Sequence, residues 1–249
     1  MKTRRLRDIE TYIHSRKNVT LDELCLTFDV SKNTIRRDIN QILQKGSIEK
    51  VYGGVVSAEK LISFENRNVE RRDEKTEIGR LAAEYVEEND LIFIDSGTTT
   101  CNIMNFLEPD RHLTILTNSL DVINSAASMP NVHLLVVGST YKRSTRSFVG
   151  VDDMRALEKY NVNKAFMSAT GVSLAHGLTN SDLLEYEIKK SIAKRTEKLI
   201  LLADSDKFGR STLLTYADFA DLDVLVTSSD LPADYAESCR ANGIALRQV

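Results

Sequence analysis

One stretch decides the fold of this 249-residue chain: residues 31–43, SKNTIRRDINQIL. Its apolar residues fall at i, i+4, i+7 and i+8, the spacing of one helix face: Ile35, Ile39, Ile42 and Leu43. Ser31 stands at the position of a helix N-cap. The opposite face carries cationic and amide side chains: Lys32, Asn33, Arg36, Arg37, Asn40 and Gln44. Because Arg and Asn match base edges and Lys matches phosphate, this face predicts contact with a DNA major groove.

A shorter helix is predicted immediately before this stretch. Thr20 and Glu23 have the spacing of a capping box, and apolar residues at helical spacing follow as far as Phe28. Only Asp29 and Val30 then precede Ser31, and two helices joined by so few residues cross sharply. The pattern therefore predicts a helix-turn-helix.

The flanking segments complete a small domain. Upstream, Leu6, Ile9 and Ile13 predict a first helix. Downstream, we expect Gly46 to end the recognition helix, and residues 48–56 predict two short strands around a Gly-Gly turn. Three helices followed by a hairpin describe a winged helix.

These features resemble the N-terminal domain of DeoR-type bacterial transcriptional regulators across roughly residues 4–56. The matching residues are Ser31, Thr34, Arg36, Arg37, Asp38, Gly46, Gly53 and Gly54. The resemblance implies binding to double-stranded operator DNA, with contacts expected from Ser31, Lys32, Asn33, Thr34, Arg36, Arg37, Asn40, Lys50, Tyr52 and Gly53. The family usually has Arg where this chain has Lys50, so a phosphate contact is expected there instead of a bidentate one.

Charge is distributed unevenly along the chain. Residues 1–60 carry 12 Lys or Arg against 8 Asp or Glu, a net charge of +4, whereas the remainder carries 21 against 28, a net charge of −7. The net positive charge of residues 1–60 is therefore suited to binding the phosphates of DNA. The scattered Cys25, Cys101 and Cys239 lack metal-ligand spacing, and the apolar runs are too short to span a bilayer. These features predict a cytoplasmic protein without a metal, a cofactor or a membrane partner.

From Asp73 onward, helical patterns alternate with short apolar strands. Strands are predicted at residues 91–95, 113–116, 132–137, 165–168, 199–203 and 222–226, and helices around residues 78–86, 98–107, 183–193 and 232–241. Continuous apolar strands separated by helices predict a parallel sheet covered on both faces, a doubly wound α/β fold. We expect a winged helix-turn-helix domain at residues 1–57, a linker at 58–72 and an α/β domain at 73–249.

Small, hydroxyl-rich or glycine-rich turns follow most of these strands. In doubly wound sheets, ligands bind beyond the carboxyl ends of the strands, and backbone N–H groups at helix N-termini favour an anion. Phosphate is the expected anion, and the other polar groups suit a phosphorylated sugar better than a nucleotide. The expected effector-binding residues are Asp95, Ser96, Gly97, Thr98, Thr99, Thr100, Thr117, Asn118, Gly138, Gly171, Asp204 and Lys207.

The same turns resemble the effector domain of the DeoR family, through residues 95–99, 117–119, 171, 177–179 and 204–209. That domain is similar in fold to ribose-phosphate isomerases, so the resemblance implies a sugar-phosphate effector and a repressor of carbohydrate metabolism genes. The chain departs from the family pattern at Ser139, where glycine is usual, and at Asn163, where Asp is usual. We expect homo-oligomers, dimers or tetramers, on a near-palindromic operator.

Two functions remain open at this point. The first is a regulator that senses a sugar phosphate. The alternative is a sugar-phosphate isomerase with an appended DNA-binding module, for which Asp95 and Glu185 are candidate bases. Glu185 is expected on a helix surface, and His176 in a structural or neutral role. Arg143 and Arg146 are expected in a loop, either within reach of phosphate or in solvent.

Overall fold

The computed structural model describes the chain except residues 1, 17, 45–47, 52–53, 58–68 and 151–153. Contacts divide the chain into two compact units, residues 1–63 and 64–249. The expected linker at 58–72 overlaps this division, and most of it lies outside the described residues. The predicted end of the recognition helix at Gly46 lies outside them as well. Each unit is described by itself below.

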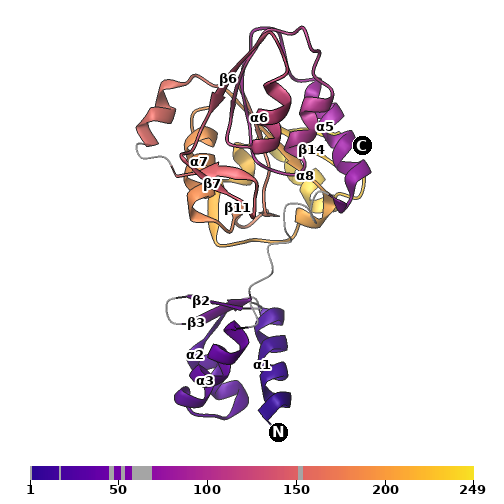
Figure 1. Cartoon of the computed structure of the whole chain (residues 1–249). Helices are drawn as coiled ribbons and strands as arrows, with labels where there is room; N and C mark the ends of the chain where they lie inside the picture. The colour runs from indigo at the N-terminus through magenta and orange to yellow at the C-terminus, as the bar shows by residue number, and fades with distance from the viewer. Residues whose placement is uncertain (1, 17, 45–47, 52–53, 58–68, 151–153) are drawn as a thin grey trace. The chain divides into compact units, whose positions relative to one another are not determined.

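The first unit contains three helices and a small antiparallel sheet (Figure 1). Its elements are α1 (Lys2–Arg16), β1 (Asn18–Thr20), α2 (Leu21–Phe28), α3 (Lys32–Leu43), β2 (Ile48–Val51) and β3 (Gly54–Ser57). Strands β2 and β3 form the predicted hairpin. Strand β1 was not predicted; it pairs antiparallel with β3 and completes a three-stranded sheet. This arrangement confirms the winged helix-turn-helix.

Capping fixes the two helices of the helix-turn-helix. The Thr20 side chain accepts a hydrogen bond from the backbone N–H of Glu23 at the start of α2, and the Ser31 side chain accepts one from Thr34 at the start of α3. Asp29 adopts φ 49° in the turn between them. The predicted stripe is buried, with Ile35, Ile39 and Ile42 at 2% exposure or less, so α3 presents its polar face outward.

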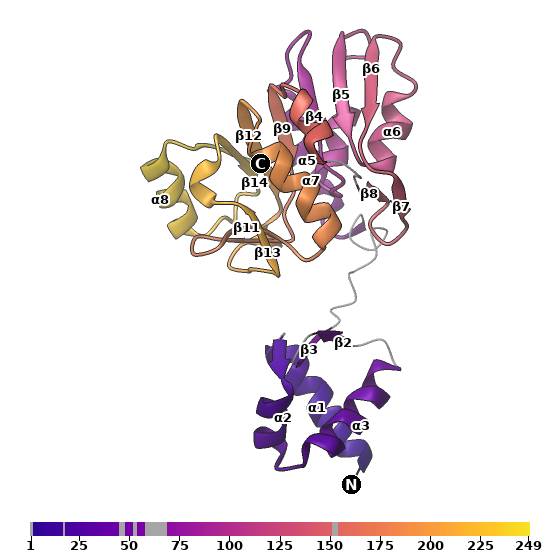
Figure 2. The same ribbon diagram turned by 90° about the vertical axis from the view of Figure 1, so that its left-hand side faces the viewer.

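The second unit is built on a seven-stranded parallel sheet (Figure 2). Its strands are β4 (Leu91–Ile94), β5 (Leu113–Thr117), β6 (Val132–Val136), β9 (Lys164–Met167), β12 (Lys198–Ala203), β14 (Val224–Thr227) and β15 (Ala245–Gln248). They lie in the order β15-β14-β12-β9-β4-β5-β6. From β4 the chain builds outward through β5 and β6, then returns and builds the other way from β9. The order therefore reverses between β4 and β9, which is the topological switch point of a doubly wound sheet.

Helices cover both faces of this sheet, as its strands require. They are α5 (Arg72–Ala83), α6 (Leu120–Ala126), α7 (Leu183–Ala193) and α8 (Ala233–Asn242). Alternate strand residues enter two separate cores: Ile92 and Ile94 pack with residues of α5 and α6, whereas Phe93 packs with residues of α7 and α8. The predicted doubly wound α/β domain is confirmed.

Smaller elements connect the strands and helices of the second unit. They are β7 (Thr140–Lys142), β8 (Ser147–Val149), β10 (Gly171–Ser173), β11 (Gly177–Asn180), β13 (Leu214–Ala217) and the 3₁₀ helices η1 (Thr100–Asn105), η2 (Met154–Lys159), η3 (Ser205–Lys207) and η4 (Phe219–Asp221). Strands β7 and β8 form a hairpin, and β10, β11 and β13 form a small antiparallel sheet. The helix predicted at 98–107 was wrong in type and too long, because only residues 100–105 are helical and they form the 3₁₀ helix η1.

Candidate functional site

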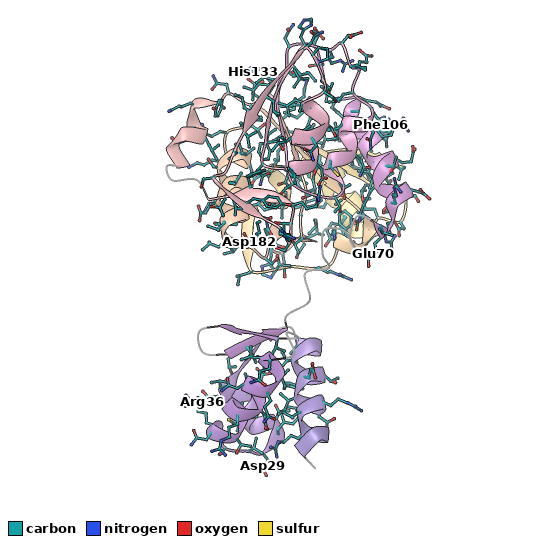
Figure 3. All side chains as sticks on the ribbon, viewed as in Figure 1. Asp29, Arg36, Glu70, Phe106, His133 and Asp182 are labelled. Carbon is teal, nitrogen blue, oxygen red and sulfur yellow. The ribbon has the colours of Figure 1, made fainter. Side chains whose placement is uncertain are left out.

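The recognition helix α3 displays the side chains that were predicted to contact DNA. Lys32, Asn33, Arg36, Arg37 and Asn40 are all exposed, and Figure 3 shows Arg36 projecting from α3 toward solvent. Ser31 is exposed at the N-cap and Thr34 is half-buried beside it. Lys50 lies in β2, but its side chain, together with Tyr52 and Gly53, lies outside the described residues.

A partly buried ion pair joins α3 to α1. The Arg5 Nε atom of α1 donates to the Asp38 Oδ2 atom at 2.8 Å, and Asp38 is only 1% exposed. Because the Asp38 carboxylate is buried, it does not lie among the exposed Lys and Arg side chains, and the exposed face of α3 remains cationic. Lys32 lies at the rim, where its Nζ atom is 2.5 Å from the Asp22 Oδ1 atom.

In the second unit, the carboxyl ends of β4 and β9 hold a buried charged cluster. The Asp95 Oδ2 atom, directly after β4, accepts hydrogen bonds from the Ser168 backbone N–H at 3.0 Å and from the Ser168 hydroxyl. The Lys189 ammonium of α7 donates to the same Asp95 oxygen and to the Ser168 carbonyl oxygen at 2.9 Å. Asp95 is 1% exposed and Lys189 is 4% exposed. A buried charge pair thus lies at the switch point.

Tyr216 completes this cluster. Its hydroxyl donates to the Ser168 carbonyl oxygen at 2.9 Å, and its ring lies 5.4 Å from the Lys189 ammonium. Burial, assisted by the negative charge of Asp95, raises the pKa of Tyr216 well above its ordinary value. Tyr216 therefore remains a hydrogen-bond donor over the physiological pH range.

The loop after β4 is closely packed and has unused backbone donors. Ser96, Thr98, Thr99 and Thr100 are buried, and a Cβ atom on Gly97 would lie 2.4 Å from the Ser168 hydroxyl oxygen. The Thr100 hydroxyl donates to the Asp95 and Gly97 carbonyl oxygens at 2.7 and 3.0 Å. No described group accepts a hydrogen bond from the backbone N–H groups of residues 96–99. Buried N–H groups in a row need a partner, and an anion supplies one.

The loop after β5 lies beside the β7–β8 hairpin. The Thr117 hydroxyl donates to the Ile94 carbonyl oxygen at 2.6 Å and so joins the ends of β4 and β5. The Asn118 amide nitrogen donates to the Phe148 carbonyl oxygen, while its buried Oδ1 atom has no hydrogen-bond partner among the described residues. Ser119 caps α6. Asn118 therefore offers a buried acceptor to a ligand hydroxyl group.

Glu185 extends the polar cluster and corrects one expectation. It is 8% exposed rather than on the helix surface, because β8 and β11 cover that face of α7. Its Oε1 atom accepts from the Ser147 hydroxyl at 2.9 Å and its Oε2 atom from the Asn180 amide at 3.3 Å. Glu185 lies one helical turn before Lys189, so α7 carries two buried charges on the same face.

Lys189 and Ser168 were not predicted as site residues. A signal for Lys189 was present, since it follows Glu185 by four residues and adjoins the buried Ile188 and Ile192. A charged pair next to an apolar stripe indicates a covered polar patch. Ser168 carried no signal, because serine at a strand end is ordinary.

Two of the three glycines predicted in the effector site, Gly138 and Gly171, lie where neighbouring backbone approaches closely. Gly138 adopts φ 98°, and a Cβ atom there would lie 2.5 Å from the Phe148 backbone in β8. At Gly171 a Cβ atom would lie 2.7 Å from the Arg210 carbonyl oxygen. Both allow neighbouring loops to approach closely.

The loop after β12 lies at the same edge of the sheet. Asp204 is 2% exposed, and its Oδ2 atom lies 3.9 Å from the Lys75 Nζ atom of α5, without a hydrogen-bond partner among the described residues. Lys207 is half-buried at the end of η3. Lys75, itself buried, was not predicted. Asp204 thus lies beside Lys75 of α5 at the edge of the sheet.

Other polar residues have defined positions elsewhere. Arg146 forms two hydrogen bonds with Asp121 of α6, at 3.0 and 2.7 Å, whereas Arg143 and His176 are exposed. The Asn163 side chain accepts from the Leu91 backbone N–H at 2.9 Å, at the amino end of β4. The departure from the family pattern at Asn163 therefore lies at the opposite edge of the sheet from the candidate site.

Two further observations limit the chemistry. The described part of the chain contains no group of three or more His, Cys, Asp or Glu side chains that could hold a metal ion. None of its helices combines the length and apolar character needed to cross a membrane.

Comparison with known proteins decides the family. Residues 5–61 match the DeoR-like helix-turn-helix domain, and residues 70–229 match the DeoR C-terminal sensor domain. The chain belongs to the DeoR family of transcriptional regulators. It is similar to the HTH-type transcriptional regulator IolR of Bacillus subtilis, with 56% identity over 99% of both chains. It is also similar to the putative aga operon transcriptional repressor of Escherichia coli O157:H7, with 25% identity over 91% of this chain and 86% of the relative.

This membership makes the protein a DNA-binding transcriptional regulator rather than an enzyme, so the isomerase alternative does not stand. Among solved structures, ribose 5-phosphate isomerase A of Methanocaldococcus jannaschii is similar, with a TM-score of 0.41 and 16% identity over 55% of this chain and 54% of that chain.

Proposed function

We propose that this DeoR-family protein is a repressor of carbohydrate metabolism genes whose binding to operator DNA is controlled by a phosphorylated sugar. Exposed Arg36, Arg37 and Asn40 on α3 would bind base edges, with Lys32, Asn33, Ser31 and Thr34 near the phosphates. Repression agrees with the name of the aga operon relative. A protein of this kind acts on the chromosome, so we place it in the cytoplasm.

The observation that carries the effector proposal is the arrangement at the switch point. Residues 96–99 are buried, and their backbone N–H groups have no acceptor among the described residues, so these groups suit a phosphate. Asp95, Lys189 and Asn118 lie beside them and suit a sugar: Asp95 and Asn118 accept from hydroxyl groups, and Lys189 donates to a carbonyl or ring oxygen. Both halves of the ligand thus have partners of matching chemistry.

The hydrogen bonds of the switch-point cluster favour an exchange of partners when a ligand binds. The Lys189 ammonium already donates to Asp95 and Ser168, so a ligand oxygen must replace one of these contacts or share it. A ligand hydroxyl that donates to Asp95 would replace the hydrogen bond that this carboxylate loses from Lys189. Binding would therefore change the loops at the ends of β4 and β9, and such a change is what a sensor requires.

DNA recognition in this proposal needs a pair of subunits. One α3 reads one half-site, so a homodimer or higher oligomer would place two recognition helices in successive major grooves of a near-palindromic operator.

A thermal-shift experiment tests the effector proposal. Glucose 6-phosphate, fructose 6-phosphate and ribose 5-phosphate are compared with the same sugars lacking phosphate, because a ligand that binds the folded state adds about 2.7 kcal/mol at 100 times its Kd. We expect at least one phosphorylated member to raise the melting temperature and its unphosphorylated counterpart to have no effect.

Two variants on α7 place the binding at the switch point. Lys189→Met should abolish the ligand-induced shift, whereas Lys190→Met, on the exposed neighbouring residue, should retain it. Stabilisation that survives Lys189→Met would remove the switch-point cluster from the proposal.

A further inference from the structure

Helix α5 of the sensor unit contacts both of the loops proposed to hold the effector. In sequence, α5 follows the segment that leads from the DNA-binding unit. Its first residues meet the loop after β12, and its middle meets the η1 segment that continues the loop after β4. Because α5 contacts both loops, a change in either loop on effector binding can alter the position of α5.

Three contacts join the start of α5 to residues 204–206. The Arg71 Nε and Nη2 atoms donate to the two carboxylate oxygens of Asp206, at 2.9 and 3.0 Å. The Glu74 Oε1 atom accepts from the Ser205 backbone N–H at 3.2 Å. The Lys75 ammonium donates to the Glu70 carbonyl oxygen at 2.8 Å and lies 3.9 Å from the Asp204 carboxylate. Every residue of this loop segment is thus paired with the first turn of α5.

The middle of α5 is fixed against the other loop. A Cβ atom on Gly79 would lie 2.6 Å from the Asn102 Cβ atom, so the helix and η1 are in close contact. The Asn102 amide in turn donates to the Thr98 carbonyl oxygen at 2.8 Å. A displacement of the Thr98 loop would therefore be passed to α5 through Asn102.

Arg71 combines a strained backbone with a paired side chain. It precedes α5 in the left-handed region, at φ 52°, and makes no side-chain cap. A residue with a Cβ atom persists there when its surroundings fix it, and such strain is common at switch segments. The surroundings here are the two bonds to Asp206 and a third, from Nη1 to the Glu74 Oε2 atom at 3.0 Å. Because Asp206 is one of these partners, the conformation of Arg71 depends on the β12 loop.

We propose that the Arg71–Asp206 pair couples effector occupancy at the carboxyl edge of the sheet to the start of α5, and thereby to DNA binding. The inference rests on the proposed function and adds the route by which its signal leaves the site. Arg71 is a positioning residue: it acts through the β12 loop and does not contact the ligand. The pair holds one arrangement of α5, and effector binding at Asp204 and the Thr98 loop favours another.

The experiment compares full-length variants on an operator duplex selected from random DNA with the wild-type protein. The effector probe is the sugar phosphate that gives the largest thermal shift. The measured quantity is the ratio of operator Kd with and without saturating probe, which in allosteric proteins is on the order of 5 to 150. Arg71→Gln and Asp206→Asn should lower this ratio about fivefold while leaving the Kd for the probe unchanged.

Controls separate coupling from a general structural effect. Asp206→Glu keeps the carboxylate and should retain most of the ratio. Arg80→Gln removes an arginine from the same helix that pairs only with Glu77 and Glu84 among the described residues, and should retain all of it. In the wild-type protein, the probe should also change amide hydrogen exchange at residues 71–76, a result that needs no variant to fold.

Each other outcome rejects a distinct statement. An unchanged ratio in Arg71→Gln, with no exchange change at residues 71–76, overturns the coupling role and leaves the proposed function standing. Loss of probe binding in Arg71→Gln would assign Arg71 to ligand contact, and that result also overturns the coupling role. If no sugar phosphate binds, or if a bound one leaves the operator Kd of the wild type unchanged, the proposed function fails and the inference fails with it.

Discussion

At the scale of single residues, Arg36 and Asp38 show how two neighbours on one helix serve opposite purposes. Asp38 is buried and paired with Arg5, whereas Arg36 is exposed and forms no ion pair with another described residue. The guanidinium can therefore reach a base edge and bind it through two hydrogen bonds. The face of the helix on which each residue lies therefore decides its role: the Asp38 charge stabilises the domain, and the Arg36 charge is free to contact DNA.

Replacing Arg36 by Ala should weaken operator binding by about 1–3 kcal/mol and relax sequence preference at one position of each half-site, because a bidentate base contact would be lost. Fluorescence anisotropy with the selected operator and single-base variants measures both effects. The matched control is Arg7→Ala, which removes an exposed arginine from α1. Equal losses on all sequences would assign Arg36 to phosphate contact instead.

At the scale of elements, Lys164 joins β9 to the turn before β4. Its ammonium lies 2.7 Å from Asp90 Oδ2 and 2.5 Å from Glu87 Oε2, and the Lys164 and Asp90 side chains are about 10% exposed. The hydrogen bond from Lys164, together with its charge, lowers the pKa of Glu87. A carboxylate whose pKa is lowered by folding stabilises the fold above its unfolded pKa, and this contribution is lost as pH falls through the folded pKa.

Lys164→Met should therefore lower the free energy of unfolding at pH 7 by about 3 kcal/mol, mainly because the buried Asp90 carboxylate would lose its cation and keep only the hydrogen bond from the Glu87 backbone N–H. The difference from wild type should shrink below about pH 4, where carboxylates take up protons. Urea titrations at pH 7 and pH 3 measure this difference in unfolding free energy. The control is Lys159→Met, which replaces an exposed lysine. A difference that does not change with pH would show that the ion pair is not its cause.

The elements also show which features the sequence could predict. The stripe in α3 and the apolar strands were predicted because each pattern repeats a regular spacing. The segment 98–107 was assigned to the wrong type of helix because the Thr100 hydroxyl and Asn102 amide bind nearby backbone carbonyls, in competition with a regular helix. Glu185 was misplaced because periodicity shows which face is apolar, but not that β8 and β11 cover a polar one.

At the scale of the whole molecule, the chain joins a helix-turn-helix unit to a sensor unit, and each has its own core. The sensor loops were predictable because a doubly wound sheet brings its strand ends to one edge. Lys189 and Lys75 were not predicted, because they come from helices and the sequence pattern alone does not show which loop a helix side chain meets. The proposed regulation requires that the effector bind more tightly when the protein is off its operator.

The most direct test of this account is a titration of the selected operator with full-length protein, with and without the stabilising sugar phosphate. The account predicts that the sugar phosphate raises the operator Kd by a factor on the order of 5 to 150, and that Lys189→Met keeps the effector-free Kd but loses the increase. An operator Kd that is the same with and without a sugar phosphate shown to bind the wild-type protein would contradict it.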